Sequence, residues 1–290
     1  MVVEVAGART ARLMWTLVEP VHAVTYFAAQ AREAFEVSGL RGFWRGYFAG
    51  RAAPLGAVGP GLVTAAFFTF APRMVQRALP DVWERAAPAV ALAARMDGAR
   101  AALRRALPGD PAAAVALLER AAAATDCAGR VMAGANAELP AATDPVERLW
   151  QLATLFREHR GDGHIAALVA AGLDGCETLA WRASLDLDRA VLQPSRGWTD
   201  EEWDAAQARL VERGWLTGDG AATEAARTAQ TDIEFATDRA AAGPWRALSE
   251  QEFATLVEEL TPLAASVGLP QPNPIGVPPA GAAMAEGAAS

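Results

Sequence analysis

Four side chains able to take part in chemistry share one face of a predicted helix near the start of the chain. Trp15, Glu19, His22 and Tyr26 are spaced by four, three and four residues, which aligns them along a helix. In such a row Glu19 is placed to orient His22 or to raise its pKa. His22 is then a candidate acid or base beside Tyr26 as proton donor, or alternatively a ligand to a metal or to haem iron.

A second predicted helix, Leu40–Ala53, is rich in aromatic and arginine side chains. Tyr47 offers a second phenol, and Arg45 and Arg51 are able to hold a carboxylate through paired hydrogen bonds. Together with the first row, this composition fits a pocket for a planar, anionic ligand. The candidate catalytic residues are His22, Glu19, Tyr26 and Tyr47, and the candidate ligand-binding residues are Trp15, Phe27, Trp44, Arg45, Phe48, Arg51, His164 and Trp181.

The same residues also allow a purely structural interpretation. Aromatic side chains at helical spacing usually belong to a core, and a single histidine on such a face is usually a hydrogen-bonded structural residue. Arg45 and Arg51 are alternatively partners for acidic residues of the second half. Residues 1–143 carry 15 Arg and 11 acidic residues, whereas residues 144–290 carry 11 Arg and 23 acidic residues.

Composition removes several classes of function. All 26 basic residues are arginine, so that a Schiff-base lysine and a P-loop lysine are both excluded. No GxGxxG, GxSxG or HExxH motif is present, and the net charge of −8 gives no general attraction to nucleic acid or anionic lipid. Cys127 and Cys176 are predicted to be free thiols of a cytoplasmic protein. The apolar stretch Leu55–Pro72 is too short and too interrupted to span a membrane.

The pattern of apolar residues predicts helices almost throughout. Leu62–Phe70 has no polar face and is expected to be buried, and the helix over Pro145–Arg160 is expected to break at Gly161–Gly163. His159 and His164 flank that break and form a weaker candidate metal site with Glu158 and Asp162. The other predicted helices are Arg9–Gln30 with a kink at Pro20, a short helix to Ser38, Arg73–Leu79, Asp81–Leu107, Pro111–Ala135 capped by Asp110, His164–Ala171, Asp174–Ser184, Glu224–Ala242 and Ser249–Val267.

One segment, Trp198–Thr223, has the pattern of a winged helix-turn-helix. Thr199 and Glu202 form a capping box, Gly214 suits a helix end, and Gly218–Gly220 predicts a tight turn between two short strands. The helix is nevertheless unsuited to DNA. It carries five acidic residues, namely Asp200, Glu201, Glu202, Asp204 and Glu212, against two basic ones, Arg209 and Arg213.

Three pairs of segments indicate an internal duplication. Arg12–Trp15 matches Arg148–Gln151, Ala34–Leu40 matches Ala167–Leu173, and Met74–Leu79 matches Arg209–Gly214 more loosely.

On these motifs, residues 144–267 resemble one subunit of the MarR-type winged-helix regulators, through helix order and RLVERGWLTGDGAATEAAR. Residues 1–143 resemble a degenerate second copy without a wing. The whole chain is similar to an actinobacterial family known only as helix-turn-helix, through EPVHAVTYF, GLRGFWRGYFAGRAAPLG and PNPIG. The resemblance implies a mainly α fold of tandem, duplicated winged-helix-like domains, 1–143 and 144–267, forming an intramolecular pseudo-dimer with a small β-wing in the second copy, followed by a Pro/Gly-rich tail, 268–290.

MarR proteins are dimers that bind small aromatic ligands between their dimerisation helices and their DNA-binding lobes. The resemblance therefore implies a comparable cleft between the halves of this chain. We expect a cytoplasmic protein, a monomer or a homodimer, that binds a small-molecule ligand and not DNA or membrane, with catalysis through His22 as an open option. The alternatives are a transcriptional regulator of the MarR type and a structural or dimerisation module.

Overall fold

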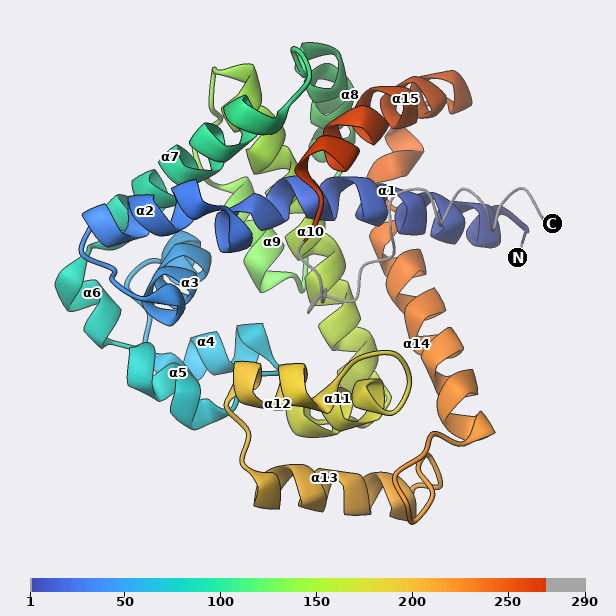
Figure 1. The fold of residues 1–290 in the computed structure, drawn as a ribbon. Helices are drawn as coiled ribbons and strands as arrows, with labels where there is room; N and C mark the ends of the chain where they lie inside the picture. Colours follow the sequence, from blue (N-terminus) through green and yellow to red (C-terminus); the bar gives the residue numbers. More distant parts are fainter. Residues whose placement is uncertain (1, 270–290) are drawn as a thin grey trace.

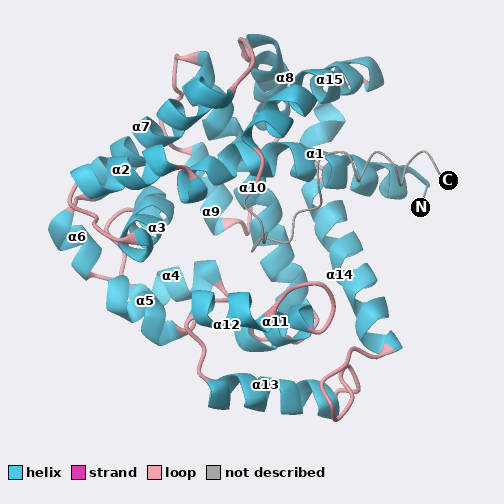
Figure 2. Cartoon of the chain, viewed as in Figure 1, coloured by secondary structure: helices cyan, strands magenta, loops and turns pink. Residues whose placement is uncertain are grey.

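The computed structural model describes residues 2–269, and most of them lie in helices joined by short turns (Figure 1, Figure 2). The helices are α1 (Val2–Phe27), α2 (Ala29–Val37), α3 (Phe43–Ala52), α4 (Pro60–Phe67), α5 (Pro72–Ala78), α6 (Asp81–Arg85), α7 (Pro88–Ala106), α8 (Ala112–Ala123), α9 (Val131–Ala137), α10 (Pro145–Ala170), α11 (Gly175–Ala183), α12 (Arg189–Arg196), α13 (Asp200–Glu212), α14 (Glu224–Ala241) and α15 (Glu250–Val267), with 3₁₀ turns η1 (Ala53–Leu55) and η2 (Pro244–Ala247).

The two longest helices, α1 and α10, form the centre of the molecule. Each packs against the other and against α14, and α15 packs against α1, above it in the view of Figure 1. The core between them combines both halves of the sequence, because Met14 and Leu17 of α1 are fully buried with Leu149 and Trp150 of α10. Burying such large apolar side chains contributes about 2 kcal/mol each, so the halves depend on each other for stability.

A second core lies under α2, α3 and α7. Phe35 of α2 fills the groove beside two glycines of α3, where a Cβ on Gly50 would lie 2.5 Å from the Phe35 ring and one on Gly46 would lie 2.9 Å from it. The glycines therefore set how closely α2 and α3 approach.

A third core holds α11, α12 and α13 together around Trp181, Trp203 and Leu210. The predicted capping box of α13 is confirmed: the Glu202 backbone N–H donates to Thr199 Oγ1, and the Thr199 N–H donates to the Glu202 carboxylate. The predicted wing is reduced. Among residues 2–269 no β-strand is formed, and only a single antiparallel bridge joins Leu216 to Ala222 around the Gly218–Gly220 turn.

Several predicted boundaries in the first half are wrong. The helix predicted over Asp81–Leu107 divides into α6 and α7, because the residue before Pro88 is driven out of the helical region. The helix predicted over Pro111–Ala135 divides into α8 and α9, and Pro111 itself is the N-cap, with Asp110 accepting from the Ala112 N–H at 3.1 Å. The predicted helix Leu62–Phe70 ends at Phe67 and is not wholly buried, since Leu62 is 45% exposed.

The predicted break at Gly161–Gly163 is also wrong, because α10 is continuous from Pro145 to Ala170. Tertiary contacts outweigh the low helix propensity of the two glycines. Asp162 lies between them and accepts hydrogen bonds from the backbone N–H groups of Met132 and Ala133, both at 2.9 Å, at the start of α9. Helix α12 was not predicted, and α1 extends from Val2 to Phe27 rather than from Arg9 to Gln30.

None of the helices within residues 2–269 combines the length and the apolarity that a bilayer crossing requires. The predicted Pro/Gly-rich tail and its PNPIG motif lie mostly or wholly outside the described residues.

Candidate functional site

A cavity of about 440 Å³ lies between the two halves of the chain. Figure 1 shows the helices that contribute to it, with α1 and α3 from the first half and α10, α11 and α12 from the second. The part of its wall that the first half of the chain contributes is mainly aromatic, and the part from the second half is rich in arginine. The residues that line it include Trp15, Glu19, Tyr26, Phe27, Phe43, Trp44, Tyr47, Arg157, Arg160, His164, Arg182, Val191, Arg196 and Glu234.

The predicted row on α1 faces this cavity in part. Trp15, Glu19 and Tyr26 line it, whereas His22 lies behind Tyr26 with 2% of its surface exposed. His22 Nδ1 is 2.9 Å from Thr154 Oγ1, and Nε2 is 3.0 Å from the Tyr26 hydroxyl. Burial, reinforced by the charge of Arg157, holds the pKa of His22 well below its ordinary value.

The predicted pairing of Glu19 with His22 is wrong. Glu19 instead accepts from Trp15 Nε1 at 3.0 Å and pairs with Arg157 at 3.3 Å. Glu19 therefore does not raise the His22 pKa, the opposing effect of the Glu158 charge is smaller than that of burial, and both ring nitrogens already have partners on the protein. His22 is a neutral link between α1 and α10, and this arrangement leaves no free ring nitrogen for the iron or metal ligand considered from the sequence.

The two tyrosines meet at the cavity wall. The ring centroids of Tyr26 and Tyr47 are 5.0 Å apart, and Arg51 Nη1 donates to the Tyr47 hydroxyl at 3.2 Å. Burial raises the pKa of Tyr26 above its ordinary value, so this phenol stays protonated. The tyrosines thus supply flat apolar surface and neutral hydrogen-bonding groups.

The two predicted anion clamps are occupied by the protein's own carboxylates. Arg51 binds Glu158 through Nε and Nη2, both at 3.0 Å, and Glu158 also accepts from Arg157 at 2.9 Å. This is the alternative in which Arg51 pairs with an acidic residue of the second half. Arg45 is largely exposed and pairs with Asp81 of its own half at 3.4 Å. Neither arginine lines the cavity.

A second buried ionic group, formed by Arg12, Arg160, Glu234 and Asp238, borders the cavity beside Trp15. Arg160 Nη2 binds Glu234 and Asp238, both at 3.0 Å, and Arg12 binds the same two carboxylates at 2.6 and 2.7 Å. The two guanidinium groups lie on the Trp15 ring, with Arg160 at 4.0 Å and Arg12 at 5.4 Å from its centroid. These contacts fix Trp15 as a rigid wall.

His164 contributes a hydrogen-bond acceptor to the cavity wall. Thr237 Oγ1 donates its only hydrogen to the Ile233 carbonyl at 2.7 Å and must therefore accept from His164 Nδ1 at 2.9 Å. Nε2 is then unprotonated, and no described residue donates to it. Burial lowers the pKa of His164 to about 4, which keeps the ring neutral at physiological pH.

The remaining predicted ligand residues divide into two groups. Phe27 and Trp44 line the cavity. Phe48 is fully buried in the core below it, and Trp181 is buried against Trp215, with ring centroids 5.1 Å apart. Within the described residues, no three His, Cys, Asp or Glu side chains converge as a metal-binding group. His159 and His164 therefore form no such group with Glu158 and Asp162.

Arg196, at the end of α12, was missed by the sequence patterns. It lines the cavity with its guanidinium 4.8 Å from the Phe70 centroid, and Nη1 donates to Ser195 Oγ at 3.1 Å. Its Nε is buried without a hydrogen-bond partner among the described residues, and no carboxylate there pairs with it. Burial lowers the pKa of this arginine from its ordinary value.

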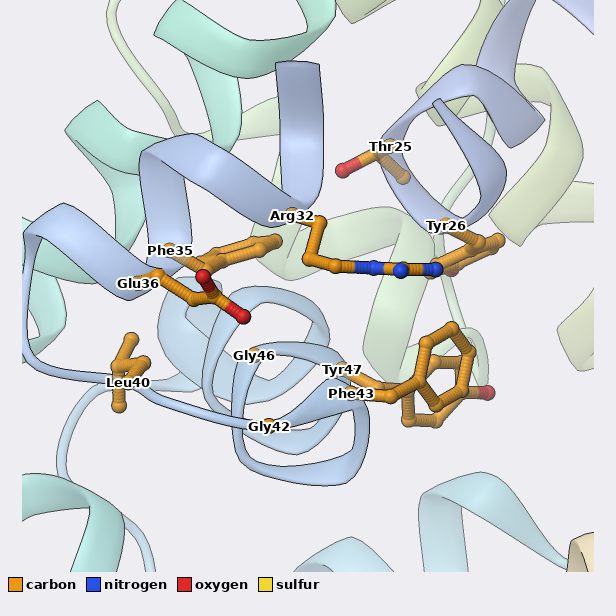
Figure 3. Close-up of a pocket in the computed structure, with 10 residues that line it drawn as sticks. All are labelled: Thr25, Tyr26, Arg32, Phe35, Glu36, Leu40, Gly42, Phe43, Gly46 and Tyr47. Carbon is orange, nitrogen blue, oxygen red and sulfur yellow. The ribbon is translucent and has the colours of Figure 1, made fainter. Parts of the chain in front are cut away.

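A much smaller pocket of about 20 Å³ adjoins the same aromatic wall (Figure 3). Figure 3 shows the Arg32 side chain lying flat between Phe35 and Tyr26, with Phe43 and Tyr47 facing it from α3. This volume suits one water molecule at most, so it is not a ligand site.

The surface of α13 carries mainly acidic charge. Asp200 is 79% and Asp204 67% exposed at the side chain. The basic residues beside them are engaged: Arg189 pairs with both aspartates at 2.9 and 3.5 Å, and Arg209 pairs with Asp174 and Glu177, each at 2.6 Å. Arg213, at the end of the helix, donates to the Ala171 and Gly172 carbonyls at 2.8 and 2.7 Å, so acidic side chains outnumber unpaired cations on this face.

The chain matches the sequence model of one family. The sequence model of a family described as "Helix-turn-helix family" matches residues 11–269. No curated protein matches the chain, and no solved structure does either.

Proposed function

Because the chain belongs to this helix-turn-helix family, we propose that it is a small-molecule-binding member that holds a planar aromatic ligand between two winged-helix-like halves. The observation that carries the proposal is the cavity of about 440 Å³, a volume typical of small-molecule sites. Four aromatic rings that face it, Trp15, Tyr26, Trp44 and Tyr47, offer flat surfaces to a planar compound.

The order of helices supports a duplicated, MarR-like arrangement. In the first half α3 has 10 residues and α7 has 19, and in the second half α11 has 9 and α14 has 18. The helices before α3 and α11 end in the same way. Leu40 N–H donates to the Phe35 carbonyl and Leu173 N–H to the Leu168 carbonyl, each after a glycine of positive φ. The cavity then corresponds to the ligand cleft between two subunits.

Filling the cavity is expected to weaken ligand binding. Val191 lines the wall on α12, so Val191→Trp occupies ligand space, and Gly161→Leu does so from α10, where a Cβ has no neighbour closer than 3.8 Å. Binding of 2-naphthol and 2-naphthoate, measured by calorimetry, is expected to weaken at least about tenfold in both variants, since each removes the space that burial of the ring requires.

Val211→Trp is the matched control, because Val211 lies on α13 with 38% of its surface exposed. It should bind both probes as the native chain does. Failure of both probes to bind the native protein at millimolar concentration, or equal binding by all variants, would contradict the proposal.

DNA binding is expected to be absent or very weak. The exposed acidic side chains of α13 repel phosphate, and Arg189 and Arg209 are already paired. Fluorescence anisotropy of a labelled random-sequence duplex at about 150 mM salt is expected to show no saturable change at micromolar protein, where non-specific DNA-binding proteins respond. A saturable, salt-sensitive signal would instead favour the transcriptional regulator.

A further inference from the structure

The first ionic group beside the cavity is balanced in charge. Glu19 and Glu158 are matched by Arg51 and Arg157 through contacts of 2.9 to 3.3 Å. Burying any of these four charged groups without a partner of opposite charge is strongly unfavourable. Each group therefore keeps its partner within the protein. None of the four is available to hold the charge of a ligand.

The second ionic group is balanced as well. Its carboxylates, Asp186, Glu234 and Asp238, are matched by Arg12, Arg160 and Arg182. Arg182 pairs with Asp186 at 2.8 Å and reaches Glu234 at 4.0 Å. Arg160 has a buried Nε without a partner, but its charge is neutralised by two carboxylates.

One cationic group on the cavity wall, Arg196, has no counterion among residues 2–269. Arg196 uses only Nη1 in hydrogen bonds, to the side chain and carbonyl of Ser195. The opposite edge of its guanidinium, Nε and Nη2, is the edge that binds a carboxylate through two parallel hydrogen bonds. Two contacts keep it in place: its carbonyl accepts from the Ala71 N–H at 2.9 Å, and the Phe70 ring supports the guanidinium.

We propose that the cavity takes an aromatic monocarboxylate, with the carboxylate on Arg196 and the ring against Trp44 and Tyr47. The Phe70 ring connects the two ends of this site, because its centroid lies 5.9 Å from that of Trp44 and 5.5 Å from that of Tyr47. A second carboxylate on the ligand meets no unpaired cation and lies among Glu19 and Glu234, so a dianion is disfavoured. This inference rests on the proposed function.

The test compares three planar probes and three arginine variants by calorimetry at pH 7.5. The probes are 2-naphthoate, neutral 2-naphthol and naphthalene-2,6-dicarboxylate, and the variants are Arg196→Gln, Arg196→Lys and Arg189→Gln. The native protein is expected to bind 2-naphthoate about tenfold or more tightly than either other probe, as a charge-assisted pair predicts. Arg196→Gln removes this preference while 2-naphthol binding persists, and Arg196→Lys retains part of it.

Arg189→Gln is the control, because Arg189 lies on the same helix but pairs with Asp200 on the surface. It is expected to leave all three affinities unchanged. The inference is overturned if 2-naphthol binds as tightly as 2-naphthoate, if the dicarboxylate binds best, or if Arg196→Gln keeps the native preference; in these cases the proposed function stands. If no probe binds the native protein, the proposed function and this inference fail together.

Discussion

Replacement of Glu158 by alanine is expected to lower the free energy of unfolding by about 3–5 kcal/mol, the usual effect of removing one partner of a buried ion pair. The Glu158 side chain is 2% exposed and carries the only negative charge in contact with Arg51 among the described residues. Removing it leaves Arg51 without a counterion inside the protein and leaves Arg157 with the longer contact to Glu19, at 3.3 Å. Urea denaturation followed by tryptophan fluorescence measures the change.

Two further variants separate the effect of charge from the loss of any side chain. Glu158→Gln keeps the size and part of the hydrogen bonding, so its effect should fall between those of the native protein and Glu158→Ala. Glu119→Ala removes the partner of Arg148 from a pair in which Glu119 is 50% exposed, and it should change stability by less than about 1 kcal/mol. Equal effects of Glu158→Ala and Glu119→Ala would show that the buried network does not hold the halves together.

The sequence was sufficient for features that depend on local interactions. Thr199 and Glu202 lie three residues apart, and a capping box needs nothing beyond them, so the start of α13 was correctly predicted. The break predicted at Gly161–Gly163 is wrong because α10 is stabilised there by contacts with residues that are distant in the sequence. Asp162 is held by the N–H groups of Met132 and Ala133, about 30 residues earlier in the chain, and no local pattern reveals that contact.

In the candidate site too, the features that depend on one helix were predicted, and the contacts between distant helices were not. Helical spacing correctly indicated that Trp15, Glu19 and Tyr26 share a face, because that depends on one helix alone. The partners of these residues come from distant helices. Glu19 faces Arg157 rather than His22, and Arg51 faces Glu158, 107 positions away. Arg196 has no distinguishing neighbours in the sequence. It stands out only in space, as the cavity-lining arginine that pairs with no carboxylate of the described residues.

Mild acid is expected to unfold the protein, because all three histidines are held neutral in the folded state. Burial lowers the pKa of His159 and of His164 from 6.5 to about 4, and it holds that of His22 well below its ordinary value. Well above pH 6.5 these residues are neutral in both the folded and the unfolded chain, so they give stability no pH dependence there. Between about pH 6.5 and pH 4 the unfolded chain binds more protons, so stability falls as pH falls.

Each shift to about 4 corresponds to a loss of about 3 kcal/mol by the time the pH reaches 4. Two such losses, with a further contribution from His22, are comparable to the whole stability of an ordinary domain. Urea denaturation at pH 7.5, 6.5, 5.5 and 5.0 is expected to show a decline that steepens below pH 6.5. Most of this range lies above the pH at which the unfolded chain protonates glutamates such as Glu158 and Glu234, whose pKa values are lowered in the folded protein, so these carboxylates add to the decline only near pH 5.

His164→Gln identifies the source of the decline. Glutamine does not titrate in this range, so the slope of stability against pH near pH 5.5 should fall by about 1.4 kcal/mol per pH unit, the contribution of one proton. Its stability at pH 7.5 reports separately on the lost hydrogen bond to Thr237. An unchanged slope in this variant would mean that His164 is already protonated in the folded protein, and Nε2 would then donate to a ligand in the cavity instead of accepting from it.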